Sequence, residues 1–199
     1  MKKILTLLVA VIVLSGCKST MMQSAQSQKL DNAESGSAQV VFVRSAFVAQ
    51  AIQASVFDVT NGEPEFIGIV SDETQVKYDT EGGERMFMVV GESADFLKAE
   101  LKEGKTYYSI VTPRMGFWKA RFSLHPVRND DSAKFSYDNE RVQKMMKNAE
   151  FVEVTPEAEK WATNNMPDIK QKYAEYLPAW KSKDVSQRQE ATLRAEDHL

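Results

Sequence analysis

Residues 118–127, WKARFSLHPV, alternate between apolar and polar side chains over most of their length. A period of two is typical of a β-strand that has one face against a core. The apolar face carries Trp118, Ala120, Phe122 and Leu124, and the polar face carries Lys119, Arg121, Ser123 and His125. The stretch therefore predicts a half-buried strand with Trp118 in the core.

Similar runs recur through residues 38–128 and are separated by turn residues. The run AQVVFVR (38–44) is apolar almost throughout, which is typical of a strand covered on both faces. Segments such as TNGE (60–63) supply turn chemistry between the runs. We predict a mainly β domain at 38–128, an antiparallel β-sandwich or open barrel of seven to eight strands. The other predicted strands are IQASVFDV (52–59), FIGIV (66–70), TQVKY (74–78), RMFMVV (85–90), ADFLKAEL (94–101) and TYYSIVT (106–112).

The apolar period becomes helical after Arg128, so the fold is expected to be α+β overall. We predict that Asp138 caps one helix and that Thr155-Pro156 begin another, which should break or kink at Pro167. Two to three helices are expected in the extension 129–180, packed on the β domain through an apolar stripe. The alternative for that stripe is an amphipathic arm for a partner or a membrane surface. The tail 181–199 is polar and is expected to fray.

The N-terminus has the organisation of a secretory signal. Lys2 and Lys3 precede the apolar run ILTLLVAVIVL (4–14), whose eleven residues cover about 16 Å as a helix, against about 30 Å for a bilayer core. The following Leu14-Ser15-Gly16-Cys17 resembles a bacterial lipobox. That resemblance implies cleavage after residue 16 and acylation of Cys17, with palmitate-like chains that would hold the protein in a membrane.

The residues after the lipobox indicate where the protein is placed. Lys18 stands where enterobacterial lipoproteins retained at the inner membrane carry Asp, so the resemblance favours the outer membrane, facing the periplasm. Residues 17–37 are rich in Ser and Gln and predict an acylated cysteine followed by a flexible tether, with a short helix as the alternative. Such a tether would have a root-mean-square span of about 25 Å and a limit of about 70 Å.

Composition excludes several classes of protein. The 199 residues include 25 Lys+Arg, 28 Asp+Glu, one Cys and two His, and the mean hydropathy is -0.39. These values exclude a polytopic membrane protein, a disulfide scaffold and a Cys-rich metal site. Loss of Lys2 and Lys3 with the signal makes the mature chain more acidic, which argues against nucleic acid as a partner. We expect no cofactor and no metal.

No catalytic set emerges from the residue pattern. Cys17 is assigned to lipid, His125 lies on the polar face of a strand, and His198 is next to the last residue. Asp130, Asp131, Asp138 and Glu140 lack the spacing of a calcium loop and are interpreted as a solvated linker with a helix cap. We therefore predict a non-catalytic structural or binding module. The alternative is a cell-envelope hydrolase that acts on glycan through a carboxylate pair.

Charge is segregated along the chain. Residues 57–84 hold eight acids and one base, whereas residues 104–129 hold five bases and no acid. We predict a basic binding face for an anionic envelope component, a glycan or a lipid headgroup, or for another envelope protein. Its candidate residues are Arg114, Phe117, Lys119 and Arg121. The alternative is sheet-to-sheet charge pairing within the domain, or an ordinary solvated face.

Four blocks of the β region resemble an uncharacterised family of β-rich domains found in small bacterial lipoproteins and secreted proteins. They are VVFVR (40–44), FIGIV (66–70), YDTEGGERMFMVVGE (78–92) and LKEGKTYYSIVTP (101–113). The family shows an early strand ending in Arg-Pro and a later Pro-Gly turn, where this chain has Arg44-Ser45 and Gly82-Gly83. The resemblance implies a small β-rich domain over about 38–128 and brings no catalytic residue with it.

Overall fold

The computed structural model describes residues 21–46, 52–117 and 120–199. The predicted signal peptide, Cys17, Trp118 and Lys119 lie outside the described residues. Three helices are described, namely α1 (Glu140–Asn148), α2 (Pro156–Lys181) and α3 (Val185–Glu190). The described strands are β1 (Met22–Ser24), β2 (Ser37–Arg44), β3 (Ala54–Asp58), β4 (Glu65–Val70), β5 (Thr74–Glu81), β6 (Gly83–Val90), β7 (Ala94–Leu101), β8 (Thr106–Arg114), β9 (Arg121–Pro126), β10 (Glu150–Val154) and β11 (Thr192–Leu193). The predicted β-rich α+β fold is confirmed.

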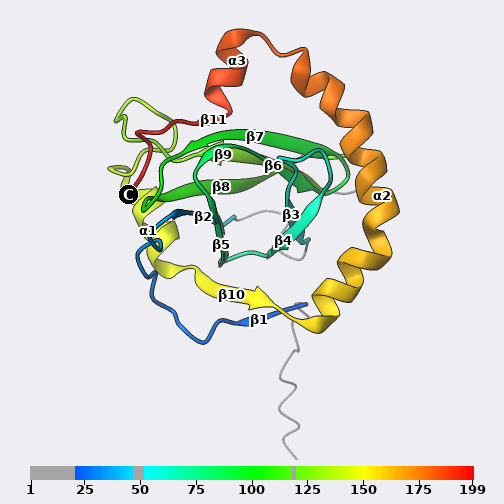
Figure 1. Cartoon of the computed structure of the whole chain (residues 1–199), viewed down its shortest axis with the longest axis horizontal. Helices are drawn as coiled ribbons and strands as arrows, with labels where there is room; N and C mark the ends of the chain where they lie inside the picture. The colour runs from blue at the N-terminus through cyan, green and yellow to red at the C-terminus, as the bar shows by residue number, and fades with distance from the viewer. Residues whose placement is uncertain (1–20, 47–51, 118–119) are drawn as a thin grey trace, which may run out of the picture.

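The strands form two sheets that do not close into a barrel (Figure 1). The first has the order β1-β10-β5-β2-β8-β9, and the second has the order β11-β7-β6-β3-β4. Both sheets are mixed, because β2–β8, β10–β5 and β11–β7 are parallel pairs, whereas the sequence predicted antiparallel pairing throughout. No hairpin joins the two strands of any of these pairs, so a short turn does not dictate their relative direction.

The main core lies between the two sheets. Phe42 of β2 meets Phe87 of β6 edge to face, with ring centroids 5.2 Å apart. The neighbouring Val41 and Val43 point to the other side of β2 and pack against α1 through Met145. Both faces of β2 are therefore buried, as its continuous apolar run predicted. The layers follow the order α1, first sheet, second sheet, α2.

Two glycines allow the chain to pass from one sheet to the other. Gly83, with φ 104°, begins β6 and is separated from the last residue of β5 only by Gly82. Gly104, with φ 70°, lies in the turn from β7 to β8. Backbone with positive φ is accessible to glycine at little cost, so these positions permit sharp corners. The Gly82-Gly83 segment, predicted as a turn, is thus a corner between the sheets.

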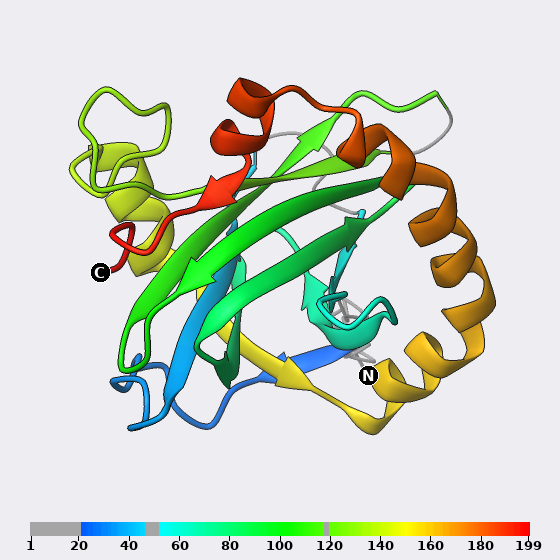
Figure 2. The ribbon, with the colours of Figure 1, turned by 45° about the horizontal axis from the view of Figure 1, so that its top comes forward.

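The helices begin near the predicted residues but differ in detail. Asn139, not Asp138, caps α1, since its side chain accepts from the amides of Arg141 and Val142. Thr155 caps α2 as predicted. The helix continues through Pro167 and curves around the second sheet (Figure 2). Its apolar stripe packs on that sheet on both sides of the proline, and this packing offsets the lost hydrogen bond.

Both terminal segments are attached to the fold, whereas their polar sequences predicted a free tether and a frayed tail. Met22 of β1 is buried in the main core, and β1 pairs with β10. At the other end, β11 pairs with β7, and the carboxylate of Asp197 is buried. Backbone pairing and a few buried side chains dock these segments, and neither leaves a strong periodic signal. No helix in residues 21–46, 52–117 and 120–199 combines the length and apolar character needed to cross a bilayer.

Candidate functional site

The hairpin between β8 and β9 projects two large apolar side chains into solvent. Met115 is 95% exposed and Phe117 is 79% exposed. The pairing of the two strands places Arg114 directly opposite Arg121 at the base of this tip. Apolar side chains that are almost fully exposed beside two guanidinium groups are typical of an interaction surface. The structure thus brings together three of the four predicted binding residues, and the fourth, Lys119, lies outside the described residues.

One carboxylate holds the tip in place. Glu92, in the β6–β7 turn, accepts hydrogen bonds at Oε1 from the Phe117 amide at 2.8 Å and from Arg121 Nε at 3.0 Å. Its own amide donates to the carbonyl of Ala120 at 3.1 Å. Like charges paired across two strands repel each other, and the Glu92 carboxylate offsets this between Arg121 and Arg114. Sequence reasoning missed Glu92, because a lone acid beside a glycine gives no signal of its partners.

The basic segment does not neutralise the acidic segment within the described residues. Acids of residues 57–84 form ion pairs with Lys77, Arg85, Lys98 and Lys170, all outside the basic segment. In the basic segment, Arg121 pairs with Glu92 and Arg128 pairs with Asp197. Arg114 is exposed and forms no ion pair with any other residue that the structure describes. Charge pairing within the domain, the predicted alternative, is thus observed for Arg121 and Arg128, with acids from outside residues 57–84.

A hollow of about 280 Å³ lies beside the tip, between the β6–β7 turn, the residues that precede β9, and α2. Glu92 and Ala120 line it on the tip side, and Trp161 and Asn165 line it on the α2 side. Lys172 also lines it and donates from Nζ to the carbonyl of Gly91 at 2.9 Å. An indole ring near amide, ammonium and carboxylate groups offers both a flat apolar surface and hydrogen bonds to a polyhydroxylated ring.

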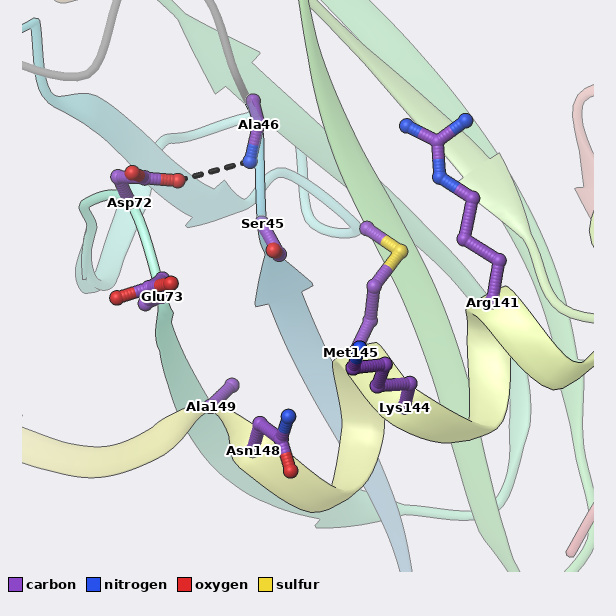
Figure 3. A pocket seen from close by; sticks show the side chains of 9 residues that line it. All are labelled: Ser45, Ala46, Asp72, Glu73, Arg141, Lys144, Met145, Asn148 and Ala149. Carbon is purple, nitrogen blue, oxygen red and sulfur yellow. Dashed lines mark hydrogen bonds between the residues drawn. The ribbon is translucent and has the colours of Figure 1, made fainter.

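A second hollow, of about 320 Å³, lies between the ends of β2 and β5 and helix α1 (Figure 3). Asp72 and Glu73 line one wall, and Arg141 and Lys144 line the opposite wall on α1. Asp72 accepts a hydrogen bond from the Ala46 amide at 2.8 Å. Walls of opposite charge suit a small solute that carries both an ammonium and a carboxylate group. The lining residues come from three distant parts of the sequence, and no sequence pattern predicted this hollow.

His125 is shielded, whereas the sequence predicted an exposed strand histidine. Its Nε2 lies 2.9 Å from the Thr112 hydroxyl, and its ring lies 5.0 Å from that of Phe135. Burial, followed by repulsion from Lys134, lowers the pKa of His125 to about 4. The imidazole is therefore neutral near pH 7. The other histidine, His198, places its ring 6.1 Å from that of Tyr107.

Two of the predicted acids meet on the surface. A hydrogen bond with Asp138 raises the pKa of Asp131, and both side chains are exposed. Asp130 instead accepts from the amide and hydroxyl of Ser132, which lowers its pKa. A fully solvated pair lacks the enclosed, desolvated setting in which carboxylates perform acid–base chemistry. Among the described residues no group of three or more His, Cys, Asp or Glu side chains is placed to hold a metal ion.

The comparisons with known proteins identify the N-terminus. A family model described as a prokaryotic membrane lipoprotein lipid attachment site matches residues 1–17. The match ends at Cys17, so the predicted lipobox is confirmed and the chain carries the attachment site of a membrane-anchored lipoprotein. No curated protein matches the chain. The resemblance of residues 38–128 to a family of β-rich lipoprotein domains remains a prediction.

Proposed function

We propose that this lipoprotein is a non-catalytic binding module of the outer membrane that faces the periplasm and captures an anionic envelope glycan at the β8–β9 tip. The observation that carries the proposal is the tip itself. It exposes Met115 and Phe117 almost completely, places them beside Arg114 and Arg121, and is held by Glu92. Covering such exposed apolar groups removes their surface from water, which favours binding.

The chemistry around the tip supports a glycan as the ligand. The indole of Trp161 and the amide of Asn165 line the adjoining hollow, where a sugar ring would find a flat apolar face and hydrogen-bond partners. The guanidinium groups of Arg114 and Arg121 supply attraction for carboxylate or phosphate substituents. A glycan without negative charge would use only the hollow, so the two arginines favour an anionic one.

Sedimentation with purified peptidoglycan sacculi tests this proposal. The detergent-solubilised lipoprotein is expected to sediment with sacculi more at 50 mM salt than at 300 mM, because salt screens charge attraction. Arg114→Glu together with Arg121→Glu should weaken capture about tenfold. Arg114→Glu alone breaks no ion pair described in the structure and should weaken the capture by sacculi less than the double substitution does. A circular dichroism melt verifies that each variant is folded.

A matched control is available on the exposed faces of α1 and α2. Lys147→Glu together with Lys160→Glu makes the same change in net charge, and neither side chain has an ion pair in the described residues. This control should reduce capture by roughly less than twofold, because salt screens the interaction of distant charges with the ligand. Equal losses for the tip and helix variants, or no capture of sacculi by the natural protein, would overturn the tip proposal. Capture of another envelope protein but not of sacculi would overturn the glycan assignment.

Two further observations test the rest of the proposal. A non-catalytic module releases no soluble fragments from sacculi during prolonged incubation, and release of glycan fragments would instead support the alternative of a hydrolase. Density-gradient separation of membranes should place the lipoprotein with the outer membrane. Recovery with the inner membrane would contradict the assignment drawn from Lys18.

A further inference from the structure

The segment that follows the lipid attachment site is fixed to the folded domain. Met22 is 5% exposed and lies in the main core, where its Cε is 3.1 Å from the position that a Cβ on Gly68 would occupy. The Thr155 hydroxyl donates to the carbonyl of Met21 at 2.6 Å. Gln23 donates to Glu153 at 2.8 Å, beside the backbone pairing of β1 with β10. These contacts make Met21 a fixed point of the domain.

Only a short length of chain separates this fixed point from the lipid. The interval from Cys17 to Met21 is four residues, which span at most about 14 Å even when fully extended. The acyl chains on Cys17 lie in the bilayer, so Met21 cannot move further than this from the headgroup layer. A free tether over 17–37 would instead allow about 70 Å.

Met21 lies at one end of the molecule. Because Thr155 contacts it and caps α2, the first turn of α2 lies at the same end. Figure 2 shows the start of β1 beside the start of α2, and it shows the yellow-green loop of residues 129–136 on the far side of the domain. Figure 1 gives the same arrangement from another direction. The lipid-bearing segment therefore joins the domain at one end and not at its centre.

We propose that the domain is held against the phospholipid headgroup surface with this end, formed by Met21, Thr155 and the first turn of α2, facing the bilayer. The end carries the acids Glu153, Glu157 and Glu159. Ionised carboxylates are costly to bury in lipid, so this end contacts the hydrated headgroups and does not insert. The orientation follows from the short link and the attachment point, and it depends on the lipid anchor but not on the ligand of the tip.

The orientation has a consequence for the candidate binding tip. Lys172, which contacts the β6–β7 turn beside the tip, lies 17 residues beyond Thr155 along α2. At 1.5 Å per residue that interval is about 25 Å of helix. With the start of α2 against the bilayer, the tip lies well along the curved helix from the membrane end, and we expect it to face the periplasmic space.

Fluorescence quenching by labelled lipids tests the orientation. The chain has a single cysteine, which the lipid occupies, so an introduced thiol is a unique labelling site. Glu157→Cys places a fluorophore at the proposed membrane end, and Ser132→Cys places one on the opposite side; both positions are exposed. The acylated proteins are reconstituted into phosphatidylcholine vesicles that contain a lipid with a nitroxide on its headgroup.

The probe at residue 157 should be quenched at least threefold more strongly than the probe at residue 132. Equal quenching, or stronger quenching at residue 132, would overturn the orientation. A twenty-residue Gly/Ser insertion after Ser19 lengthens the link and should remove most of the difference, and persistence of the full difference would show that the short link is not its cause. The difference in quenching does not depend on binding to sacculi. The orientation and the capture of a glycan at the tip can therefore be contradicted separately.

Discussion

Single side chains decide how the candidate binding tip is presented. Without Glu92, Arg114 and Arg121 would face each other across the β8–β9 pair with no compensating charge. The same carboxylate fixes the Phe117 amide, so it couples the charge of the tip to its backbone shape. Gly91, the preceding residue, must stay small, because a Cβ there would lie 2.7 Å from the Ala120 carbonyl oxygen. The tip thus depends on two adjacent residues of a different hairpin.

His125 makes the stability of the domain depend on pH. Its pKa is about 4 in the folded protein, below the ordinary value of 6.5, because burial disfavours the charged imidazole. The unfolded chain therefore takes up the proton first as the pH falls. Stability is fully present above pH 6.5 and is lost progressively down to about pH 4, by up to about 3 kcal/mol. Lys134, Arg114 and Lys183 act in the same direction, and Asp95 opposes them.

Urea denaturation of the natural protein and of His125→Gln at pH 7.5 and pH 4.5 measures this contribution. Carboxylates titrate in both proteins, so the difference between them isolates the histidine. We expect the natural protein to lose more stability on acidification than the variant. Equal losses would show that His125 is not shielded in the way the structure describes.

At the scale of secondary-structure elements, local patterns predicted what local interactions determine. The alternation of residues 120–125 and the continuous apolar run of β2 both correspond to observed strands. Thr155-Pro156 marked the start of α2, because capping involves only neighbouring residues. Asp138 was wrong as a cap by one position, since both Asp138 and Asn139 have suitable side chains and only the observed turn selects between them.

Elements that depend on distant partners could not be predicted. β1 and β11 are short strands of three and two residues whose partners, β10 and β7, are far away in the sequence. The parallel neighbours β2 and β8 are joined through five intervening strands. The curved passage of α2 through Pro167 likewise depends on the second sheet beneath it. Hydrophobic periodicity contains none of this information.

The C-terminal segment is expected to stabilise the fold through Asp197. Its carboxylate is fully buried and accepts from Arg128 at 2.9 Å and from Arg194 at 2.9 Å. Asp197→Asn leaves the shielded Arg128 without its counter-charge and should lower the free energy of unfolding by about 3 kcal/mol. Glu196→Gln is the matched control, because Glu196 is exposed and approaches the same Arg194, and it should change stability by less than about 1 kcal/mol.

Chemical denaturation of both variants at pH 7 measures the two values. Similar small effects would mean that residues 191–199 contribute little and behave as the frayed tail that their polar sequence predicted. A large loss confined to Asp197→Asn would show that the segment is part of the cooperative fold. Arg128 also donates to the carbonyls of Gln189 and Glu190, so loss of the carboxylate should also loosen the end of α3.

At the scale of the whole molecule, the lipid attachment site and the fold together define a polarity. Residues 1–17 carry the attachment site, and the chain is fixed to the domain again at Met21. The α2 helix runs from that point along the second sheet to the region of the candidate tip. We propose that one end of the domain faces the membrane and that the basic tip meets a ligand away from it.

The membrane attachment and the proposed orientation both require that Cys17 carries lipid. Mass spectrometry of the protein extracted from the membrane fraction of its host measures this directly. The account predicts a chain that begins at residue 17, with a diacylglyceryl group on the sulfur and an acylated amine, and complete loss of that species in Cys17→Ser. A full-length soluble chain with an unmodified thiol would contradict it.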